Sequence, residues 1–84
     1  MRVEVQAEGN LKIVLDIIFT KTPPGERRHF GKRELIDTGC VISRDGRLIA
    51  CEFARQNPLD DYNKIIGKKV ALAKAISQIE FLKV

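Results

Sequence analysis

The residues with the clearest capacity for chemistry lie in one basic segment in the first half of the chain. This segment combines positive charge with a histidine and an aromatic ring: Arg27, Arg28, His29, Phe30, Lys32 and Arg33. Guanidinium groups bind phosphates and carboxylates bidentately, and aromatic rings stack on bases. We therefore expect these six residues to bind an anionic partner: a nucleotide, a nucleic acid or an acidic protein surface. An ordinary solvated loop is the alternative.

The excess positive charge of the chain is concentrated in the same segment. The 84 residues carry a net charge of +4, and the stretch from Lys21 to Arg33 holds five basic residues against one acidic residue, Glu26. The rest of the chain is therefore balanced in charge. A local positive field of this kind attracts anionic ligands.

Patterns for catalysis and metal binding are weak. His29 has no Ser or Cys nucleophile near it in sequence, and helix capping and the helix dipole explain the adjacent Asp60 and Asp61. Two cysteines, Cys40 and Cys51, with a single histidine fall short of a zinc ligand set. There is also no glycine-rich phosphate loop. We expect no enzymatic activity, no metal site and no cofactor.

Length and composition indicate one small globular domain, residues 1–84. A chain with 44% hydrophobic and 31% charged residues can build a core, although at this length it holds little stability in reserve. The sequence has no apolar run long enough to span a membrane and no signal-peptide pattern. We expect a cytoplasmic protein with reduced cysteines, in a host cell if it is viral, that makes no membrane contact.

Alternating apolar residues predict an antiparallel sheet. In the clearest case, Ile13, Leu15 and Ile17 alternate with other residues, which is the period of a strand. We expect strands at about 1–7, 11–20, 34–43 and 47–55, joined as two hairpins, with a basic loop at 21–33. Prolines in this loop exclude a continuing central strand.

The second hairpin turns at Asp45-Gly46, a strong signal for a two-residue type I′ turn. This turn would place Cys40 opposite Cys51. A three-residue loop with a bulge is the alternative, and it would shift the register by one residue and separate the two cysteines.

The C-terminal part of the sequence predicts one long helix at about 58–78. Asn57 suits the N-cap and Pro58 suits the first helical position. A broad apolar stripe, which we expect to cover the sheet, contains Tyr62, Ile65, Ile66, Val70, Leu72, Ala73, Ile76 and Ile79. The predicted fold class is therefore α+β, with an antiparallel four-stranded sheet packed on one C-terminal helix.

The opposite face of this helix carries small residues. Gly67, Ala71 and Ala75 follow one another at four-residue spacing, which permits close approach of another backbone. Together with Lys64 and Lys68 they form a candidate face for self-association or for a partner. Because one helix covers only one face of a sheet, we also expect a homo-oligomer. A solvated face of good helix formers is the alternative.

One segment, residues 50–76, resembles known proteins. It contains the pattern Pro-x-Asp-x-aromatic-Asn-Lys at 58–64 and a Gly-Lys-Lys-x-Ala-Leu-Ala helix that begins at Gly67. These motifs resemble a class of small phage and prophage proteins whose layout is similar to β-β-β-α domains of the double-stranded-RNA-binding type. The class also resembles phage counter-defence proteins, some of which inhibit CRISPR effectors while others sequester nucleotide signals of host immunity.

The resemblance implies a non-enzymatic viral binding protein that antagonises host antiviral defence. It would act as an anti-CRISPR inhibitor or sequester a nucleotide immune signal, so its partner would be a host defence protein or an anionic nucleotide or nucleic acid. The chain lacks the N-terminal helix of the double-stranded-RNA-binding family, and no RNA contacts follow from that resemblance. A general nucleic-acid-binding module is the alternative function.

Overall fold

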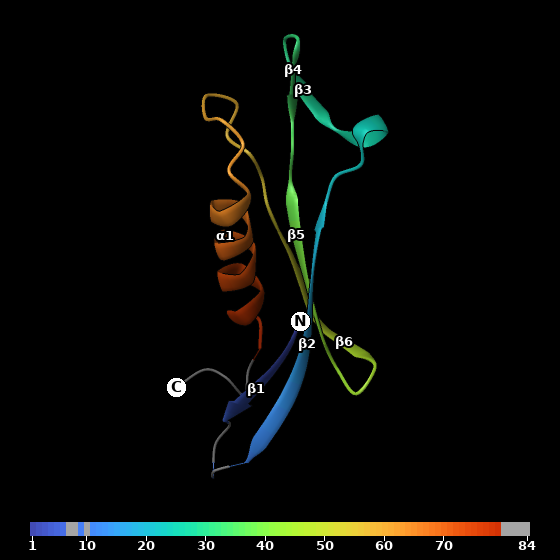
Figure 1. Ribbon diagram of the computed structural model, residues 1–84, viewed down its shortest axis with the longest axis vertical. Coiled ribbons are helices and arrows are strands. Elements are labelled where there is room, and N and C mark those ends of the chain that lie inside the picture. Colours follow the sequence, from blue (N-terminus) through green and yellow to red (C-terminus); the bar gives the residue numbers. More distant parts are fainter. Residues whose placement is uncertain (7–8, 10, 80–84) are drawn as a thin grey trace.

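The computed structural model describes residues 1–6, 9 and 11–79. Its elements follow one another as β1 (Arg2–Gln6), β2 (Lys12–Lys21), η2 (Pro24–Glu26), β3 (Arg28–Phe30), β4 (Arg33–Leu35), β5 (Thr38–Arg44), β6 (Arg47–Ala54) and α1 (Lys64–Ile76). Four of these strands form an antiparallel sheet in the order β1-β2-β5-β6, and α1 lies beside this sheet (Figure 1). The predicted α+β class and the four-stranded sheet with one C-terminal helix are confirmed.

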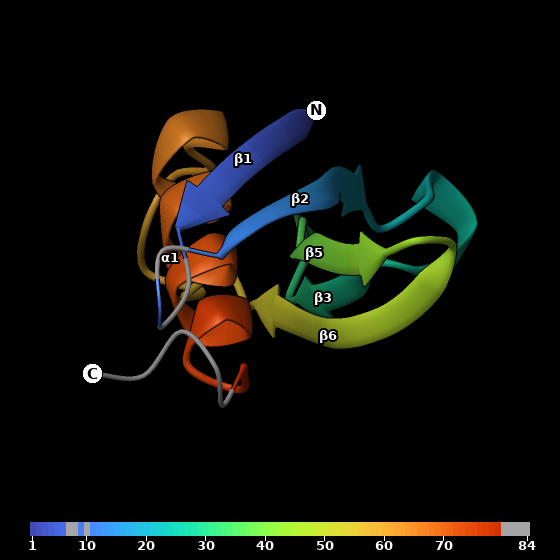
Figure 2. The same ribbon diagram turned by 90° about the horizontal axis from the view of Figure 1, so that it is seen from below.

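The main sheet and α1 form two layers, as the view along the strands shows (Figure 2). β2 sets the pattern, because Ile13, Leu15 and Ile17 are buried beneath α1 while Val14 and Ile18 on the other face are exposed. The period-two prediction for this strand is therefore confirmed. The core also takes side chains from β5, β6 and α1: Cys40, Ile42, Ala50, Ala54, Ala71 and Ala75.

α1 packs on the sheet through its small residues, so the predicted orientation of the helix is wrong. Ala71 and Ala75 are fully buried, and a Cβ atom added to Gly67 would lie 2.5 Å from Oγ1 of Thr38. The residues expected to cover the sheet include four that are exposed: Ile65, Ile66, Val70 and Ile76. The face of Gly67, Ala71 and Ala75 therefore contacts β5 and β6 and is closed to a second subunit.

α1 begins at Lys64, six residues later than predicted. Asn63 is the N-cap, and its side-chain oxygen accepts hydrogen bonds from the backbone N–H groups of Ile65 and Ile66, at 3.0 and 3.1 Å. Asn57 instead accepts a hydrogen bond from the N–H of Leu59, at 3.0 Å, and so closes a local turn. Residues 57–63 thus form a loop between β6 and α1.

The turn between β5 and β6 has the predicted two residues, with positive φ angles of 51° at Asp45 and 77° at Gly46. A bulge then shifts the register between Ile42 and Ser43. Cys40 consequently pairs with Glu52 rather than with Cys51, so the expected facing cysteines are wrong. One thiol is buried and the other is exposed on the opposite face.

The bulge decides which residues of β6 face the helix. The unshifted register would turn Ile49, Cys51 and Phe53 towards α1. The observed register turns Ala50 and Ala54 there instead, and both are buried. Small residues on β6 therefore meet small residues on α1, which allows the helix and the sheet to pack closely.

Residues 21–33 are more ordered than the predicted basic loop. β2 runs to Lys21, and β3 pairs with β4 to form a separate hairpin with Gly31 at its tip, at a φ of 63°. We call residues 24–35 the arm, and it extends beyond the end of the main sheet (Figure 1). The strand predicted at 34–43 is accordingly divided between β4 and β5. Within the described residues, no helix has the length and apolar character needed to cross a bilayer.

Candidate functional site

The three arginines of the arm are bound within the chain itself. Arg27 donates a hydrogen bond from Nε to the carbonyl oxygen of Thr22, at 2.9 Å, and its guanidinium lies 3.5 Å from the carboxylate of Glu34. Its side chain is 14% exposed. Arg27 therefore fastens the arm to the end of β2 and presents little of its charge to solvent.

Arg28 forms a bidentate pair with Asp37 between the arm and the main sheet. Its Nε donates to Oδ2 of Asp37 at 3.0 Å, one terminal nitrogen donates to Oδ1, and the same nitrogen bonds the carbonyl oxygen of Gln56 at 3.2 Å. The Asp37 carboxylate also accepts the backbone N–H of Gln56. The hydrogen bond from Arg28 holds the pKa of Asp37 below its ordinary value, because it stabilises the ionised carboxylate.

Arg33 binds the loop that precedes α1. Its guanidinium donates to the carbonyl oxygens of Pro58 and Asp60, at 3.2 and 2.7 Å, and to the carboxylate of Asp61, at 2.8 Å. These backbone oxygens are then occupied by Arg33. The contacts hold residues 58–61 in the loop conformation and explain in part why the helix starts later than predicted.

The remaining arm residues lie at its tip. His29, Phe30 and Lys32 are exposed, with Phe30 at 56%. None of the three has an ion pair or a side-chain hydrogen bond within the described chain. Of the six candidate binding residues in the arm, the three arginines thus hold the arm against the rest of the chain, and the other three form an exposed tip.

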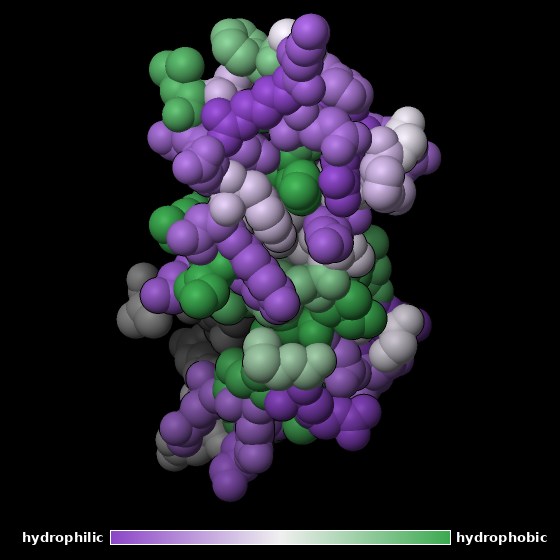
Figure 3. All heavy atoms as spheres, turned by 45° about the horizontal axis from the view of Figure 1, so that its top comes forward, coloured by the Kyte–Doolittle hydropathy of each residue, from purple (hydrophilic) through white to green (hydrophobic). Residues whose placement is uncertain are grey.

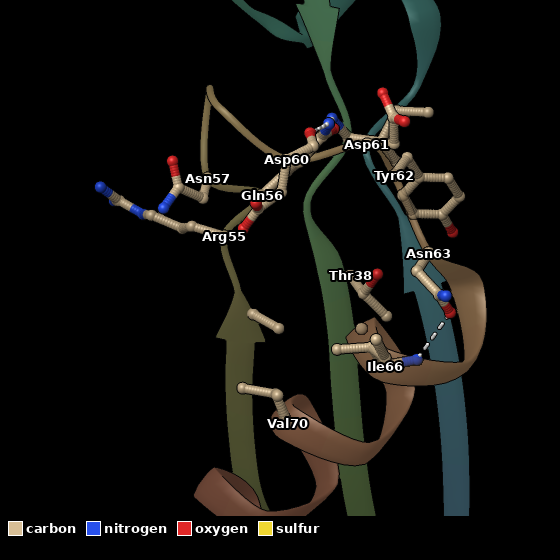
Figure 4. A pocket seen from close by; sticks show the side chains of 13 residues that line it. Thr38, Arg55, Gln56, Asn57, Asp60, Asp61, Tyr62, Asn63, Ile66 and Val70 are labelled. Atoms are coloured by element: carbon tan, nitrogen blue, oxygen red, sulfur yellow. Dashed lines mark hydrogen bonds between the residues drawn. The ribbon is translucent and has the colours of Figure 1, made fainter.

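A hollow of about 490 Å³ lies between the loop before α1 and the first turns of the helix. We call it the loop hollow. Thr38 of β5 forms its floor beside Ile66 and Val70, while Tyr62 stands on the side away from Arg55 (Figure 4). The rim of the loop hollow has a net charge of −1, from Arg55, Asp60 and Asp61. Its volume is in the range typical of small-molecule sites.

A second hollow of about 270 Å³ adjoins the first and shares Thr38 and Tyr62 with it. We call it the lysine hollow. Its other lining residues come from the end of β2 and the first turns of α1: Phe19, Thr20, Lys21, Lys64 and Lys68. Both hollows thus meet at Tyr62, next to the N-terminus of α1.

The lysine hollow is strongly positive. Lys21, Lys64 and Lys68 line it without any acidic residue. The ammonium of Lys68 lies 5.3 Å from the centre of the Phe19 ring, a cation–π contact, and within the described residues none of the three lysines has a carboxylate partner. The N-terminal end of the helix dipole adds to this field. Such an arrangement favours a bound anion.

Thr38 places a hydroxyl between the two hollows. It is 3% exposed, and its hydroxyl makes no hydrogen bond to any described residue. No described side-chain nitrogen or oxygen is both fully buried and without a hydrogen-bond partner, so this hydroxyl is open to the hollows, where a polar ligand atom can reach it. Thr20 and Tyr62 supply two further hydroxyls along the lysine hollow.

Part of this site is predictable from the sequence. Lys64 and Lys68 were assigned to a partner face together with Gly67, Ala71 and Ala75, but the structure separates them: the lysines line the hollow and the small residues face the sheet. Phe19, Thr20, Thr38 and Tyr62 were not expected in a site. The four-residue spacing of Lys64 and Lys68 was the available signal, because it places both on one helix face.

Histidine, cysteine and carboxylate side chains do not converge in the part of the chain that the structure describes. None of them form a group of three or more that could hold a metal ion. Cys40 is buried, and the same burial raises the pKa of its thiol by disfavouring the thiolate. His29 lies at the tip of the arm, outside both hollows.

In comparisons with known proteins, no family model, no curated protein and no solved structure matches this chain.

Proposed function

We propose that this chain is a non-enzymatic binding protein that holds an anionic small molecule of nucleotide type at the N-terminus of α1. The phosphate would lie in the lysine hollow and the rest of the ligand would extend past Tyr62 into the loop hollow. The observation that carries the proposal is the set of three lysines, unpaired with carboxylates among the described residues, around one hollow at the positive end of a helix.

The charges support phosphate as the bound group. Lys21, Lys64 and Lys68 surround one small volume, and mutual repulsion of their ammonium groups is relieved when an anion enters. Asn63 already caps the N–H groups of two helical residues. The lysine side chains and the helix dipole, rather than free backbone donors, would therefore supply most of the attraction.

The aromatic and hydroxyl groups support a nucleoside as the remainder of the ligand. Tyr62 borders both hollows, so its ring is placed for contact with a base or ribose. Thr20 and Thr38 offer hydroxyls to phosphate or sugar oxygens. The loop hollow adds amide and carboxylate groups at Asn57, Asp60 and Asn63, which suit the hydrogen-bonding edges of a base.

The arm serves the site indirectly in this proposal. Arg28 and Arg33 bind the segment 56–61, and that segment forms one wall of the loop hollow. They are positioning residues, because their guanidinium groups are occupied by Asp37, Asp61 and backbone oxygens. Engagement of these arginines also weakens the alternative of a general nucleic-acid-binding module that uses the arm as its contact surface.

The resemblance of residues 50–76 to small phage proteins supplies the biological role. We propose that the chain antagonises host antiviral defence by sequestering a nucleotide immune signal, in the cytoplasm of the infected cell. A basic hollow suits this role better than inhibition of a CRISPR effector by occupying a nucleic-acid path, for which acidic patches are usual. We also propose that the protein works as a homo-oligomer, because α1 covers only one face of the sheet (Figure 2).

Calorimetric titration tests the ligand class. The probes are adenosine monophosphate, a cyclic dinucleotide, inorganic phosphate and a single-stranded oligonucleotide of mixed sequence. We expect a mononucleotide or cyclic dinucleotide to bind, and the double variant Lys64→Ala/Lys68→Ala to lose at least about tenfold in affinity, because two charge-assisted contacts are removed. The chain should also bind without converting the probe, which chromatography of the mixture would verify.

Lys32→Ala/Lys69→Ala is the matched control, because it also removes two positive charges, from exposed positions outside both hollows. Its affinity should match that of the unmodified chain. Equal losses in the control and the double variant would contradict the proposed site. Binding of the oligonucleotide alone, with an affinity that falls steeply as salt rises, would instead establish the nucleic-acid alternative.

A further inference from the structure

The face of the main sheet that α1 leaves uncovered carries an apolar cluster. Alternation along the strands and the observed register place six such residues there: Val14, Ile18, Val41, Leu48, Cys51 and Phe53. Ile18, Val41 and Cys51 lie side by side across β2, β5 and β6. We call these strand positions the open face. Hydrophobic residues also reach the surface across the middle of the molecule, between two largely hydrophilic ends (Figure 3).

Phe53 is flattened onto the open face by a glycine. A Cβ atom added at Gly39 would lie 2.9 Å from the Phe53 ring and 2.4 Å from Oγ1 of Thr20. Only glycine therefore leaves room for the ring to lie across β5. The ring remains 51% exposed, so this arrangement presents a flat apolar surface and does not bury the ring in the monomer.

We infer that the open face binds the open face of a second copy of this chain, which makes the self-association proposed above specific to one surface. The charge of the open face favours a second copy of this chain as the partner. Its charged residues are two ion pairs, Arg2 with Asp16 at 3.1 Å and Lys12 with Glu4 at 3.7 Å, so the face is neutral within a chain of net charge +4. Two copies can therefore meet there without repulsion between like charges.

The exposed area agrees with the needs of a dimer. The chain has an accessible surface of 6234 Å². This exceeds by roughly 1,200 Å² the value of about 5,000 Å² typical of a compact monomer of its mass. A standard interface takes about 800 Å² from each partner.

The other apolar surface of the molecule suits a second copy less well. The outer side of α1 exposes Ile65 and Ile76, but Lys69 lies beside them. A two-fold contact through this stripe would bring equivalent lysines towards each other. The stripe therefore lacks the charge balance that the open face has.

The free edge of β6 is also poorly suited to pairing with another strand. The ammonium of Lys74 donates to the carbonyl oxygen of Phe53 at 3.3 Å, and the side-chain amide of Gln78 donates to that of Cys51 at 3.4 Å. These contacts from the helix side occupy acceptors that an added strand would need. Face-to-face packing of two sheets avoids this obstacle.

Sedimentation velocity over protein concentrations from low micromolar to millimolar tests the inference. We expect the unmodified chain to pass from monomer to dimer, and Ile18→Glu to remain monomeric because it places a charge at the centre of the open face. The side chain of Ile18 is 56% exposed, so this variant should keep its fold, which circular dichroism would check. Ile65→Glu on the outer side of α1 is the matched control and should still form the dimer, because Ile65 is exposed and lies outside both hollows.

Alkylation of Cys51 gives a second measurement on a chain with an unmodified open face. Cys40→Ala leaves a single exposed thiol, and its reaction with a maleimide should slow several-fold as the protein concentration rises and the second copy covers the face. A rate independent of concentration would overturn the inference.

The outcomes also separate the inference from the proposals on which it rests. Loss of the dimer in Ile65→Glu but not in Ile18→Glu would overturn the assigned surface and leave self-association standing. A monomer at all concentrations would overturn both. Ligand binding at the lysine hollow is measured separately by calorimetry, and it stands or falls independently of either result.

Discussion

The arm and the lysine hollow are both rich in basic residues, yet the chain treats their charges in opposite ways. In the arm, Arg27, Arg28 and Arg33 are bound by carboxylates and backbone oxygens of the same chain. In the hollow, Lys21, Lys64 and Lys68 line one small volume that contains no acidic residue. Basic residues are therefore available to a ligand only where the fold leaves them without internal partners.

The side-chain chemistry fits this division. The guanidinium of arginine is planar and has several donors, so it can tie together groups from separate segments, as Arg33 does at the loop before α1. The ammonium of lysine is a compact charge on a flexible stem. It remains available to a ligand that arrives from solvent.

The largest difference should appear in stability. Arg28→Ala removes a bidentate pair and leaves Asp37, whose side chain is 16% exposed, without its charged partner. We expect the free energy of unfolding in urea to fall, because the mostly buried Asp37 carboxylate loses its charged partner. Lys68→Ala is the comparison, and we expect its unfolding free energy to change by no more than about 0.5 kcal/mol. Equal effects of the two variants would remove the distinction between arm and hollow.

Acid should weaken the arm contact by a smaller amount. The pKa of Asp37 is lowered in the folded chain, so its pair with Arg28 stabilises the fold fully above the unfolded pKa of about 4 and is lost as pH falls through the folded value. Urea unfolding at pH 7 and near pH 3 would measure this loss. Asp37→Asn removes the titrating group, so the stability gap between this variant and the unmodified chain should narrow in acid. A constant gap would contradict the assignment.

The smallest effects are expected at the tip of the arm. Lys32→Ala changes an exposed residue with no ion pair among the described residues and outside both hollows. We expect its unfolding free energy to change by less than about 0.5 kcal/mol and its affinity for a mononucleotide to stay constant. A marked loss of affinity would move the binding site from the hollow to the arm tip.

Local sequence patterns predicted the sheet well. The alternation of apolar residues in β2 predicted which side of the strand is buried, and Asp45-Gly46 predicted the two-residue turn with positive φ angles. Both signals depend on neighbours close in the chain. The sequence allowed a bulge only together with a three-residue loop. The structure combines a bulge between Ile42 and Ser43 with the two-residue turn, and the bulge brings small residues of β6 opposite α1.

The predicted orientation of α1 is wrong because the most hydrophobic side of the helix is not the side that packs on the sheet. Ile65, Ile66 and Val70 are more apolar than the residues that contact the sheet, and they nevertheless remain exposed. The space above β5 and β6 admits only small side chains, as the approach of Gly67 to Thr38 shows. Packing volume, which depends on the partner surface, outweighed the apolar area of the helix alone.

Only part of the candidate site was predicted, because the rest of it also depends on surfaces that are distant in the sequence. Lys64 and Lys68 could be placed on one helix face from their spacing, but Phe19 and Thr38 reach the same hollow from strands distant in sequence. The N-cap at Asn63 also depended on Arg33, which binds the carbonyl oxygens of Pro58 and Asp60 from across the molecule. Such contacts have no local signature.

The sequence by itself determined the strands, the hairpin turn and the presence of one C-terminal helix, because periodicity and turn residues act through neighbours a few positions apart. Only the tertiary structure decided which face of α1 is buried and which basic residues remain unpaired with acids in the described chain. Both outcomes depend on the shape and charge of surfaces brought together from separate parts of the chain, where steric fit and internal salt bridges override the local pattern.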